Sequence, residues 1–474
     1  MIPILGLLHT AAFALFWLIN GLYYADVNNF LFTKLGKRLD YIRLTQAITY
    51  WMLLWSIVLL LLLLQRQYQP GLIAWLYLVA LGFYLLLFYG SFWFLFSQSP
   101  VQWVRLWRLF GYFRFIIDVI LLVGLVFILR AVGARFSNWY AGEIITGMVC
   151  LLIYIFLWSL PLILPPGSVY HNPLPSQPRL IAHRGASMLA PENTLAAANL
   201  AEDLGADGLE VDIRISLDGV PFLMHDNSLL RTTDVASVFP WREGDRPENF
   251  TLAELKQLNA GEWFCRSDPY KTIAKGLVSP VEIKKISQER IPTLAEILGF
   301  LEENNQVFVF DLINPPPGHP FSAQFFQLCF SQIHQAGLDA RIWFLAKGDE
   351  KEIVGITSPA MLLAYGAAYA NPPAPHTLIE QGYQVINVEY GLSFAQIPHY
   401  QRAGIKVNFY VVDEPWMFSQ AWLAGVDSLT TNNVHSMVAL SHPAFGLTKK
   451  MHLLIWGLTG LAGFGTILFS WISR

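Results

Sequence analysis

Long, uniformly apolar runs near both ends of the chain define its organisation. Six of these runs are long enough to cross about 30 Å of hydrocarbon, and they are too evenly apolar for the amphipathic helices of a soluble protein. They lie at about 2–24, 45–65, 71–96, 115–134, 143–164 and 451–471. The pattern therefore predicts five transmembrane helices before an aqueous region and one after it.

The first apolar run is expected to stay in the protein. It has neither a basic segment ahead of it nor a clean small-residue cleavage site, so it differs from a removable signal peptide. A proline-rich segment follows the fifth run and is typical of a short, stiff spacer. We divide the chain into a transmembrane domain at 1–165, a linker at 166–178, an aqueous domain at 179–448 and a sixth transmembrane helix at 451–471.

Short apolar runs alternate with helical patterns through the aqueous region. Strands are predicted near 180–182, 208–211, 221–224, 307–310, 340–345, 361–364, 384–388, 406–412 and 427–431, and helices near 192–204, 293–303, 321–336, 395–403 and 415–424. This alternation predicts an α/β fold with a parallel sheet. Nine strands exceed the eight of a barrel, and Asp218-Gly219 suits a tight hairpin, which conflicts with parallel neighbours unless it lies in a rim loop.

A long polar interval at about 231–291 separates the third predicted strand from the fourth. It is too long for an ordinary connection between neighbouring elements of a compact domain. We expect an insertion that acts as a lid or as a loop that reads the substrate.

Polar side chains follow several of the predicted strands. His183 and Arg184 end the first, Glu210 and Asp212 lie at the second, and His225 follows the third. Asp311 ends the run Val307–Phe310. Because the carboxyl ends of barrel strands form the face that carries active sites, these side chains are expected to meet there.

The chemistry of these residue types points to one kind of site. Side chains two apart on a strand share a face, so Glu210 and Asp212 are expected to converge, and paired carboxylates suit a hard divalent cation. Two histidines can flank it as general acid and general base. Arg184 offers a fork for phosphate. Which histidine has which role stays open.

The composition agrees with a membrane protein and excludes a basic nucleic-acid-binding one. Hydrophobic residues make up 54% of the chain, the mean hydropathy is +0.43 and the formal net charge is −3. The segment 45–165 holds eight charged residues: Arg66, Arg105, Arg108, Arg114, Asp118, Arg130, Arg135 and Glu143. Asp118, inside an apolar run, is expected to pair with Arg114 one turn earlier. The three cysteines form no metal-binding spacing.

The ordered motifs HRG at 183, PENT at 191, GAD with Glu-x-Asp, Asp218-Gly219, His225-Asp226 and LLRTT at 229 resemble the glycerophosphodiester phosphodiesterase family. The resemblance implies a (β/α)8 TIM barrel and metal-dependent hydrolysis. It implies His183 and His225 as the catalytic pair, Glu210, Asp212 and Asp311 as ligands of Ca²⁺ or Mg²⁺, and substrate contacts from Arg184, Glu192 and Tyr410.

Two positions depart from the family pattern. Soluble members typically carry Glu-x-Lys where this chain has Asp311-Leu312-Ile313. Asp311 can still ligate a metal, but the missing lysine removes a phosphate contact. Tyr410 replaces a tryptophan that many members stack on the glycerol.

Further segments resemble the six-transmembrane branch of the family known from animals. They are Leu258–Phe264, Phe310–Leu312, Pro315–Pro320, Glu414–Trp416 and Gly425–Asn432. This branch implies a multi-pass protein of the cell membrane with the barrel outside the cell. The basic residues of loops 25–44 and 97–114 favour the opposite side by the positive-inside rule. We follow the resemblance.

The expected activity is hydrolysis of glycerophosphodiesters to glycerol phosphate and an alcohol. Phospholipase-C-like cleavage of glycerophosphoinositol or lipid anchors, and lysophospholipase D activity, are alternatives within the class. A degenerate barrel acting as a receptor or scaffold is disfavoured by the intact His183, His225, Glu210 and Asp212. A transporter is disfavoured by the lack of an internal repeat.

Overall fold

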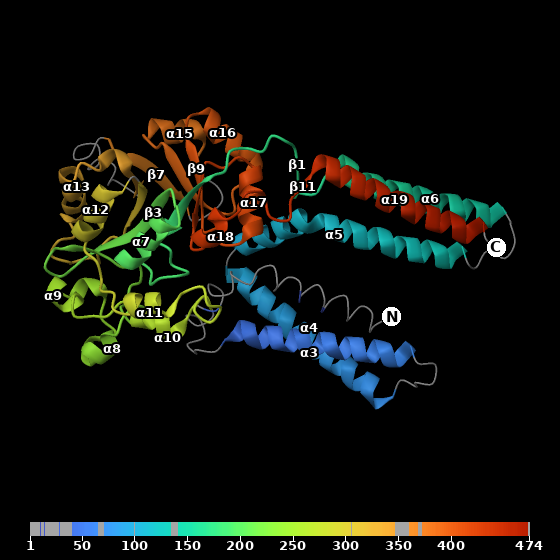
Figure 1. Ribbon diagram of the computed structural model, residues 1–474, viewed down its shortest axis with the longest axis horizontal. Helices are drawn as coiled ribbons and strands as arrows, with labels where there is room; N and C mark the ends of the chain where they lie inside the picture. The colour runs from blue at the N-terminus through green and yellow to red at the C-terminus, as the bar shows by residue number, and fades with distance from the viewer. Residues whose placement is uncertain are drawn as a thin grey trace.

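The computed structural model describes residues 40–64, 71–98, 100–133, 141–304, 306–346, 360–367 and 372–472, with isolated positions before residue 40. Apart from such isolated positions, the first predicted transmembrane run, 2–24, lies outside the described residues. The described residues form a barrel at one end of the molecule and long helices that extend away from it (Figure 1).

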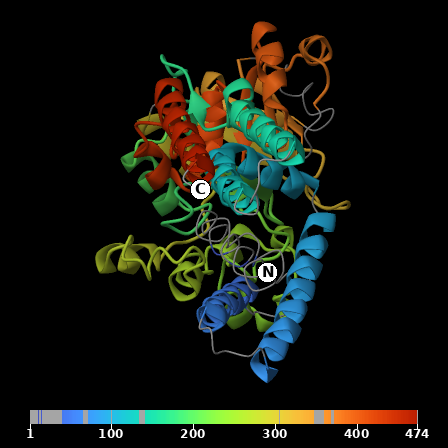
Figure 2. The same cartoon turned by 90° about the vertical axis from the view of Figure 1, so that its right-hand side faces the viewer.

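Five long helices correspond to five of the predicted apolar runs. They are α3 (Tyr41–Leu64), α4 (Leu72–Gln98), α5 (Pro100–Gly133), α6 (Ala141–Ile163) and α19 (Lys449–Ile472). Figures 1 and 2 show α5, α6 and α19 side by side and α3 with α4 as a separate pair. Among the described residues, Val104–Phe127 and Lys449–Phe469 are long and apolar enough to cross a membrane by length and composition.

The prediction of a loop at 97–114 was wrong. Helix α5 begins at Pro100 and is continuous to Gly133, because proline is well tolerated in the first turn and the arginines that follow do not interrupt a helix. Arg114 Nε lies 3.2 Å from Asp118 Oδ2 on this helix, so the predicted pair is confirmed.

Helices α6 and α19 pack with their backbones close together. Tyr154 donates a hydrogen bond of 2.6 Å to the carbonyl of Gly460, and Trp456 donates one of 2.7 Å to the carbonyl of Trp158. A Cβ at Gly460 would lie 2.1 Å from Nε1 of Trp158, so a larger residue would separate the two helices.

Eight parallel strands close into the predicted barrel. They are β2 (Arg179–His183), β3 (Gly208–Ile215), β5 (Val307–Leu312), β6 (Ile342–Ala346), β7 (Leu362–Ala367), β8 (Val385–Glu389), β9 (Lys406–Tyr410) and β10 (Ser428–Thr431). Each pairs with the next, and β10 and β3 both pair with β2. The outer helices are α7 (Leu195–Asp203), α12 (Leu294–Glu303), α13 (Phe325–Gln335), α15 (Pro375–Glu380), α16 (Ile397–Arg402), α17 (Pro415–Leu423) and α18 (Val434–Val438).

Of the nine predicted strands, the third, at 221–224, is outside the barrel. β4 (Pro221–Leu223) runs antiparallel to β3, with Ile213 opposite Leu223. The turn at Asp218-Gly219 is the tight hairpin that the sequence suggested, and Gly219 has a φ of 84°. The expectation that His225 ends a parallel barrel strand is therefore wrong, because a hairpin returns the chain to the rim.

Helix α7 is shorter than predicted. It begins at Leu195 rather than Glu192, and the side chain of Thr194 caps it by accepting from the N–H of Ala197 at 3.2 Å. Asn193 has a left-handed φ of 56°, which ends the preceding turn. Glu192 and Asn193 therefore lie in a loop at the barrel rim.

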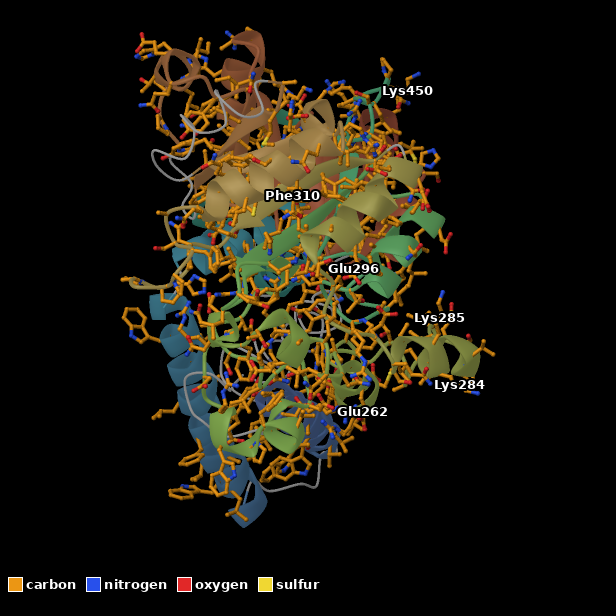
Figure 3. All side chains as sticks on the ribbon, turned by 90° about the vertical axis from the view of Figure 1, so that its left-hand side faces the viewer. Glu262, Lys284, Lys285, Glu296, Phe310 and Lys450 are labelled. Atoms are coloured by element: carbon orange, nitrogen blue, oxygen red, sulfur yellow. The ribbon has the colours of Figure 1, made fainter. Side chains whose placement is uncertain are left out.

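The insertion at 231–291 folds against β4 and α7. Its helices are α8 (Val235–Val238), η1 (Pro240–Arg242), η2 (Pro247–Asn249), α9 (Leu252–Leu255), α10 (Glu262–Ser267) and α11 (Pro280–Ile286). Phe222 and Met224 share an apolar cluster with Phe250 and Leu258 of the insertion. Lys284 and Lys285 project from α11 (Figure 3).

Helix α5 contacts the carboxyl-terminal rim of the barrel. The guanidinium of Arg108 donates to the carbonyls of Tyr390, Gly391 and Leu392 after β8, and it lies 3.9 Å from the ring centroid of Phe394. Arg105 donates a hydrogen bond of 3.4 Å to the carbonyl of Val411 after β9.

The predicted spacer also contains a short strand. β1 (Val169–Tyr170) pairs in parallel with β11 (Leu447–Thr448), just before α19. The segments that enter and leave the barrel domain are therefore joined.

Candidate active site

His183 stands at the carboxyl end of β2. Its Nδ1 lies 2.7 Å from Oδ1 of Asn432, and its Nε2 lies 3.8 Å from Oε2 of Glu210. Burial, followed by the positive charge of Arg184, lowers the pKa of His183 to about 4. The imidazole is therefore neutral at physiological pH and can accept a proton.

The three predicted metal ligands lie on neighbouring strands. His183 is opposite Glu210 in the register of β2 with β3, and Asp212 is opposite Asp311 in the register of β3 with β5. Burial and the negative charges of Asp212 and Asp311 raise the pKa of Glu210 well above its ordinary value. Repulsion between these carboxylates is thus one cause of the raised pKa.

Arg184 is engaged in ion pairs within the site. Its Nε lies 3.1 Å from Oδ2 of Asp212, and its Nη1 lies 2.9 Å from Oε1 of Glu192. Burial alone would lower the pKa of Arg184, but Asp212, Glu192 and Glu210 outweigh burial and raise it. The phosphate contact expected of Arg184 stays a prediction, since its donors face carboxylates here.

The turn after His183 requires unusual backbone geometry. Arg184 has a φ of 56° and Gly185 a φ of 86°. A Cβ at Gly185 would lie 2.6 Å from the backbone of Ala197, so only glycine fits. The backbone N–H of Arg184 lies 3.1 Å from Oε2 of Glu210, which fixes that carboxylate beside His183.

His225 is held by a network of charges that reaches into the insertion. Its Nδ1 lies 2.7 Å from Oδ1 of Asp226, whose Oδ2 lies 2.6 Å from Nε of Arg231. Arg231 Nη1 lies 2.7 Å from Oε2 of Glu192. Burial alone would raise the pKa of Asp226, but its bonds from His225 and Arg231 hold it far below the ordinary range. Asp226 is therefore an ionised acceptor for the N–H of His225.

A buried arginine fixes the backbone at His225. Arg214 of β3 donates to the carbonyl of His225 at 2.7 Å and to that of Met224 at 3.0 Å. Its guanidinium also pairs with Glu248 of the insertion, and both side chains are almost fully buried. The hairpin and the insertion together therefore set the position of this histidine.

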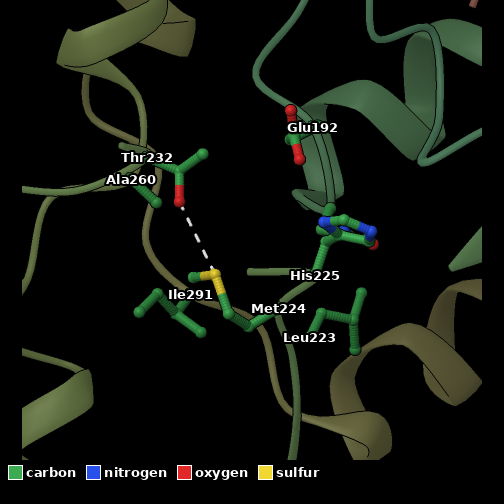
Figure 4. Close-up of a pocket in the computed structure, with 8 residues that line it drawn as sticks. Glu192, Leu223, Met224, His225, Thr232, Ala260 and Ile291 are labelled. Carbon is green, nitrogen blue, oxygen red and sulfur yellow. Dashed lines mark hydrogen bonds between the residues drawn. The ribbon is translucent and has the colours of Figure 1, made fainter. Parts of the chain in front are cut away.

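A pocket of about 250 Å³, part of it open to solvent, lies beside His225 (Figure 4). Glu192, Asn193, Leu223, Met224, His225, Thr232, Ala260 and Ile291 line it. Thr232 and Ala260 come from the insertion, so the insertion forms one wall of the candidate site.

Tyr410 ends β9 on the same rim, opposite Glu389 of β8. Burial, followed by the charges of Glu389 and Asp311, raises the pKa of Tyr410 and keeps its phenol neutral. Tyr410 is half-buried, and its contact with a glycerol group stays a prediction.

The donor chemistry fits a hard cation, although the ligands are not gathered around one point. Glu210, Asp212 and Asp311 supply the carboxylate oxygens that such ions prefer, and burial together with the charges of Asp212 and Asp311 raises the pKa of Glu210. Within the described ranges, no three His, Cys, Asp or Glu side chains stand close enough to hold a metal. Oδ2 of Asp212 instead accepts from Asn193 at 2.9 Å and lies beside Arg184.

The sequence did not single out several residues that shape the site. Asn193 contacts Asp212, Arg231 joins Glu192 to Asp226, and Asn432 contacts His183. Arg231 and Asn432 lie in motifs that the sequence showed, but only the closed barrel brings them to the histidines. The position of Asn193 could be predicted only with knowledge of the residue at which α7 begins.

The fold and the site together define a TIM barrel with two histidines and three carboxylates on its carboxyl-terminal rim. The sequence profile of the glycerophosphoryl diester phosphodiesterase family matches residues 183–436, which is more than half of the chain. The protein belongs to this family.

Curated animal proteins resemble the chain over a longer stretch. The mouse glycerophosphodiester phosphodiesterase domain-containing protein 4 is 33% identical over 346 residues, covering 72% of this chain and 54% of the mouse protein. The human glycerophosphoinositol inositolphosphodiesterase GDPD2 is 35% identical over 325 residues, covering 68% of this chain and 58% of the human protein. The chain thus spans little more than half the length of these relatives.

A solved phosphodiesterase from Oleispira antarctica, in complex with the product sn-glycerol-3-phosphate, is similar in fold. It is 24% identical, with a TM-score of 0.45, and the similarity covers 55% of this chain and 95% of that one.

Proposed function

We propose that the protein is a membrane-anchored, metal-dependent phosphodiesterase that hydrolyses glycerophosphodiesters to glycerol phosphate and an alcohol. The observation that carries the proposal is the pair of imidazoles at the barrel rim, each with its Nδ1 engaged at 2.7 Å by a side-chain oxygen. This arrangement leaves each Nε2 available for proton transfer. Membership of the family supports the reaction type.

The two histidines have different environments, which suggests different roles. His183 is buried and neutral, and it accepts the proton of the attacking hydroxyl. His225 has a side chain that is 43% exposed, and its Nδ1 is engaged by the carboxylate of Asp226. Since His183 takes the role of base, His225 is the group that protonates the leaving alkoxide.

Glu210, Asp212 and Asp311 would hold the divalent ion, Ca²⁺ or Mg²⁺. When bound, such an ion neutralises phosphate oxygens and lowers the pKa of a bound hydroxyl. Arg184 and Glu192 orient the phosphate end of the substrate, and Tyr410 contacts its glycerol. The approach of a cation is favoured because Asp212 and Asp311 add like charge to a buried Glu210, and both burial and these charges raise its pKa.

The helices anchor the barrel to a bilayer. We assign the transmembrane domain to 1–165, the linker to 166–178, the barrel with its insertion to 179–448 and the last transmembrane helix to 451–471. Five helices precede the barrel and one follows it, with the barrel outside the cell. The two helices that qualify by length and composition, and the five long helices on one side of the barrel, support this assignment.

Cleavage of glycerophosphoinositol in the manner of a phospholipase C is the second candidate. The human relative GDPD2 is named for activity on glycerophosphoinositol. Asp311-Leu312-Ile313 also lacks the lysine of the usual Glu-x-Lys pattern, which favours a modified substrate preference.

A product analysis separates these candidates. Purified protein is incubated with a panel of glycerophosphodiesters and lysolipids, with Ca²⁺ or Mg²⁺ and with chelator, and the phosphorylated product is identified. The proposal expects glycerol phosphate, formed only with metal. Inositol phosphate would select the second candidate, and no product from any substrate would contradict both.

A further inference from the structure

Asn432 connects the end of β10 to His183. Its Oδ1 lies 2.7 Å from Nδ1 of His183 and accepts a hydrogen bond of 2.7 Å from the hydroxyl of Ser187. Asn432 and Ser187 are both buried, so bulk solvent does not compete for these hydrogen bonds. The amide is therefore a fixed part of the wall behind the imidazole.

Asp413 determines which end of the Asn432 amide faces His183. One carboxylate oxygen accepts from the backbone N–H of Asn432 at 2.7 Å and from the hydroxyl of Thr431 at 3.1 Å. The other accepts from Nδ2 of Asn432 at 2.7 Å. Asn432 thus donates to Asp413 from both its backbone N–H and its amide NH₂, which turns the amide oxygen towards His183 and Ser187.

This orientation fixes the tautomer of the imidazole. Oδ1 of Asn432 can only accept, so Nδ1 of His183 must carry the proton, and the lone pair of the neutral ring lies on Nε2. Nε2 is the nitrogen that lies 3.8 Å from Glu210, on the side of the carboxylates. We propose that Asn432, oriented by Asp413, is a positioning residue that holds His183 as the Nε2 base, an inference that rests on the proposed function.

The two histidines are thus held by different chemistry. Asn432 is a neutral acceptor that fixes the tautomer of His183. Asp226 is a charged acceptor for His225 and is itself held by Arg231. The same ring nitrogen, Nδ1, is engaged in both, so Nε2 is the nitrogen left for proton transfer in each imidazole.

Exchanging the two positioning side chains tests the inference. In Asp413→Asn, the backbone N–H of Asn432 still donates to the side-chain oxygen at position 413. The NH₂ group of the new side chain therefore faces the side chain of Asn432. The Asn432 amide must then turn, its NH₂ donates to Nδ1 of His183, and the ring proton moves to Nε2. Combining Asp413→Asn with Asn432→Asp restores an acceptor towards Nδ1.

Two readouts follow these changes in the full-length protein. In substrate-free protein labelled with ¹⁵N-histidine, the His183 signal is assigned by its loss in His183→Gln. The wild type should carry the proton on Nδ1, Asp413→Asn on Nε2 and the double variant on Nδ1. With a glycerophosphodiester, kcat of Asp413→Asn should fall on the order of 100-fold or more while KM changes little, and the double variant should recover most of it.

A matched control separates positioning from folding. Asn408 is fully buried in the barrel and bonds to Asn387, Thr430 and Ser428. Asn408→Asp should lower thermal stability and leave the His183 proton on Nδ1. The inference would be overturned if His183 of the wild type carried its proton on Nε2, or if His183 had the same tautomer in the wild type and in Asp413→Asn. Because the spectra need no substrate, an inactive wild type would contradict the proposed function without affecting the tautomer result.

Discussion

At the residue scale, the charge of each group in the site is set by its nearest partners. Glu210 and Asp212 belong to the same strand and lie in the same cluster, yet their pKa values move in opposite directions. Burial and like charges raise the pKa of Glu210, whereas Arg184 outweighs burial and lowers that of Asp212. A neutralising cation is therefore most needed near Glu210.

Asp311 is the position that tests the metal site most simply. Asp311→Asn keeps the side-chain shape and removes one negative charge, so metal affinity and activity should fall, and high metal concentration should restore part of the activity. Asp311→Glu should stay active, because it preserves the carboxylate. Activity titrated against Ca²⁺ and Mg²⁺ checks both variants. An unchanged metal requirement in Asp311→Asn would remove Asp311 from the ligand set.

The spacing of residues predicted how two side chains are placed relative to each other. Glu210 and Asp212 were placed on one face because they lie two apart on a strand, and the structure confirms that both contact Arg184. The orientation of the Asn432 amide could not be predicted. It depends on Asp413, which is 19 residues away and becomes a neighbour only when β9 and β10 pair.

At the element scale, the β3–β4 hairpin explains why the strand count failed. An apolar run followed by a polar residue has the same pattern whether the strand is parallel or antiparallel. β4 returns to the level of Asp212, where the N–H of Met224 donates to the carbonyl of Asp212 at 3.0 Å. His225 therefore reaches the rim although β4 is not a barrel strand.

The ion pairs between the insertion and the barrel should make stability depend on pH. Burial alone would raise the pKa of Glu192, but Arg231 and Arg184 lower it well below its ordinary value, and Arg231 with His225 does the same for Asp226. Their stabilisation is present above the unfolded carboxylate pKa of about 4 and is lost as pH falls through the folded values.

Arg231→Gln should therefore lower the free energy of unfolding at pH 7 by about 1–3 kcal/mol, because two carboxylates lose their partner. The difference from wild type should shrink as pH falls below about 4, where both carboxylates become protonated in the unfolded chain. Thermal unfolding of both proteins in detergent at several pH values measures this difference in stability. A difference that grows in acid would contradict the assigned pairs.

Glu248 tests the buried link between the insertion and β3. Glu248→Gln leaves Arg214 charged and buried without its counter-ion, which should cost about 3–5 kcal/mol of stability. Glu254→Gln is the control, because Glu254 pairs with Arg242 at a partly exposed site of the same insertion and should cost less than about 1 kcal/mol. Equal thermal shifts in the two variants would show that the Arg214 pair does not hold the insertion.

At the scale of the whole molecule, helix α5 joins the apolar helices to the carboxyl-terminal rim of the barrel. Arg108 binds three carbonyls after β8, and the side chain of Tyr112 on the same helix donates to the carbonyl of Ala444. Hydropathy alone predicted a loop in this segment, because Arg105 and Arg108 interrupt the apolar run. Their positions on the barrel surface explain why charged residues occur in this part of the helix.

The side of the membrane that carries the barrel can be tested on intact cells. Lys284 and Lys285 are exposed on α11 and offer sites for trypsin (Figure 3). With the barrel outside, trypsin added to intact cells should cut within 231–291. The fragments are detected with tags at both termini. Protection in intact cells with cleavage only after lysis would place the barrel in the cytoplasm.

The central claim is that His183 and His225 carry out the proton transfers of phosphodiester hydrolysis. The most direct measurement is kcat of purified His183→Gln and His225→Gln on the glycerophosphodiester that the wild type turns over. His334→Gln serves as control, because His334 is exposed and pairs with Asp339. Each of the first two variants should lose on the order of 100-fold to 10,000-fold in kcat with a thermal midpoint close to wild type, and the control should lose nothing. Near-wild-type kcat in either His183→Gln or His225→Gln would contradict the account.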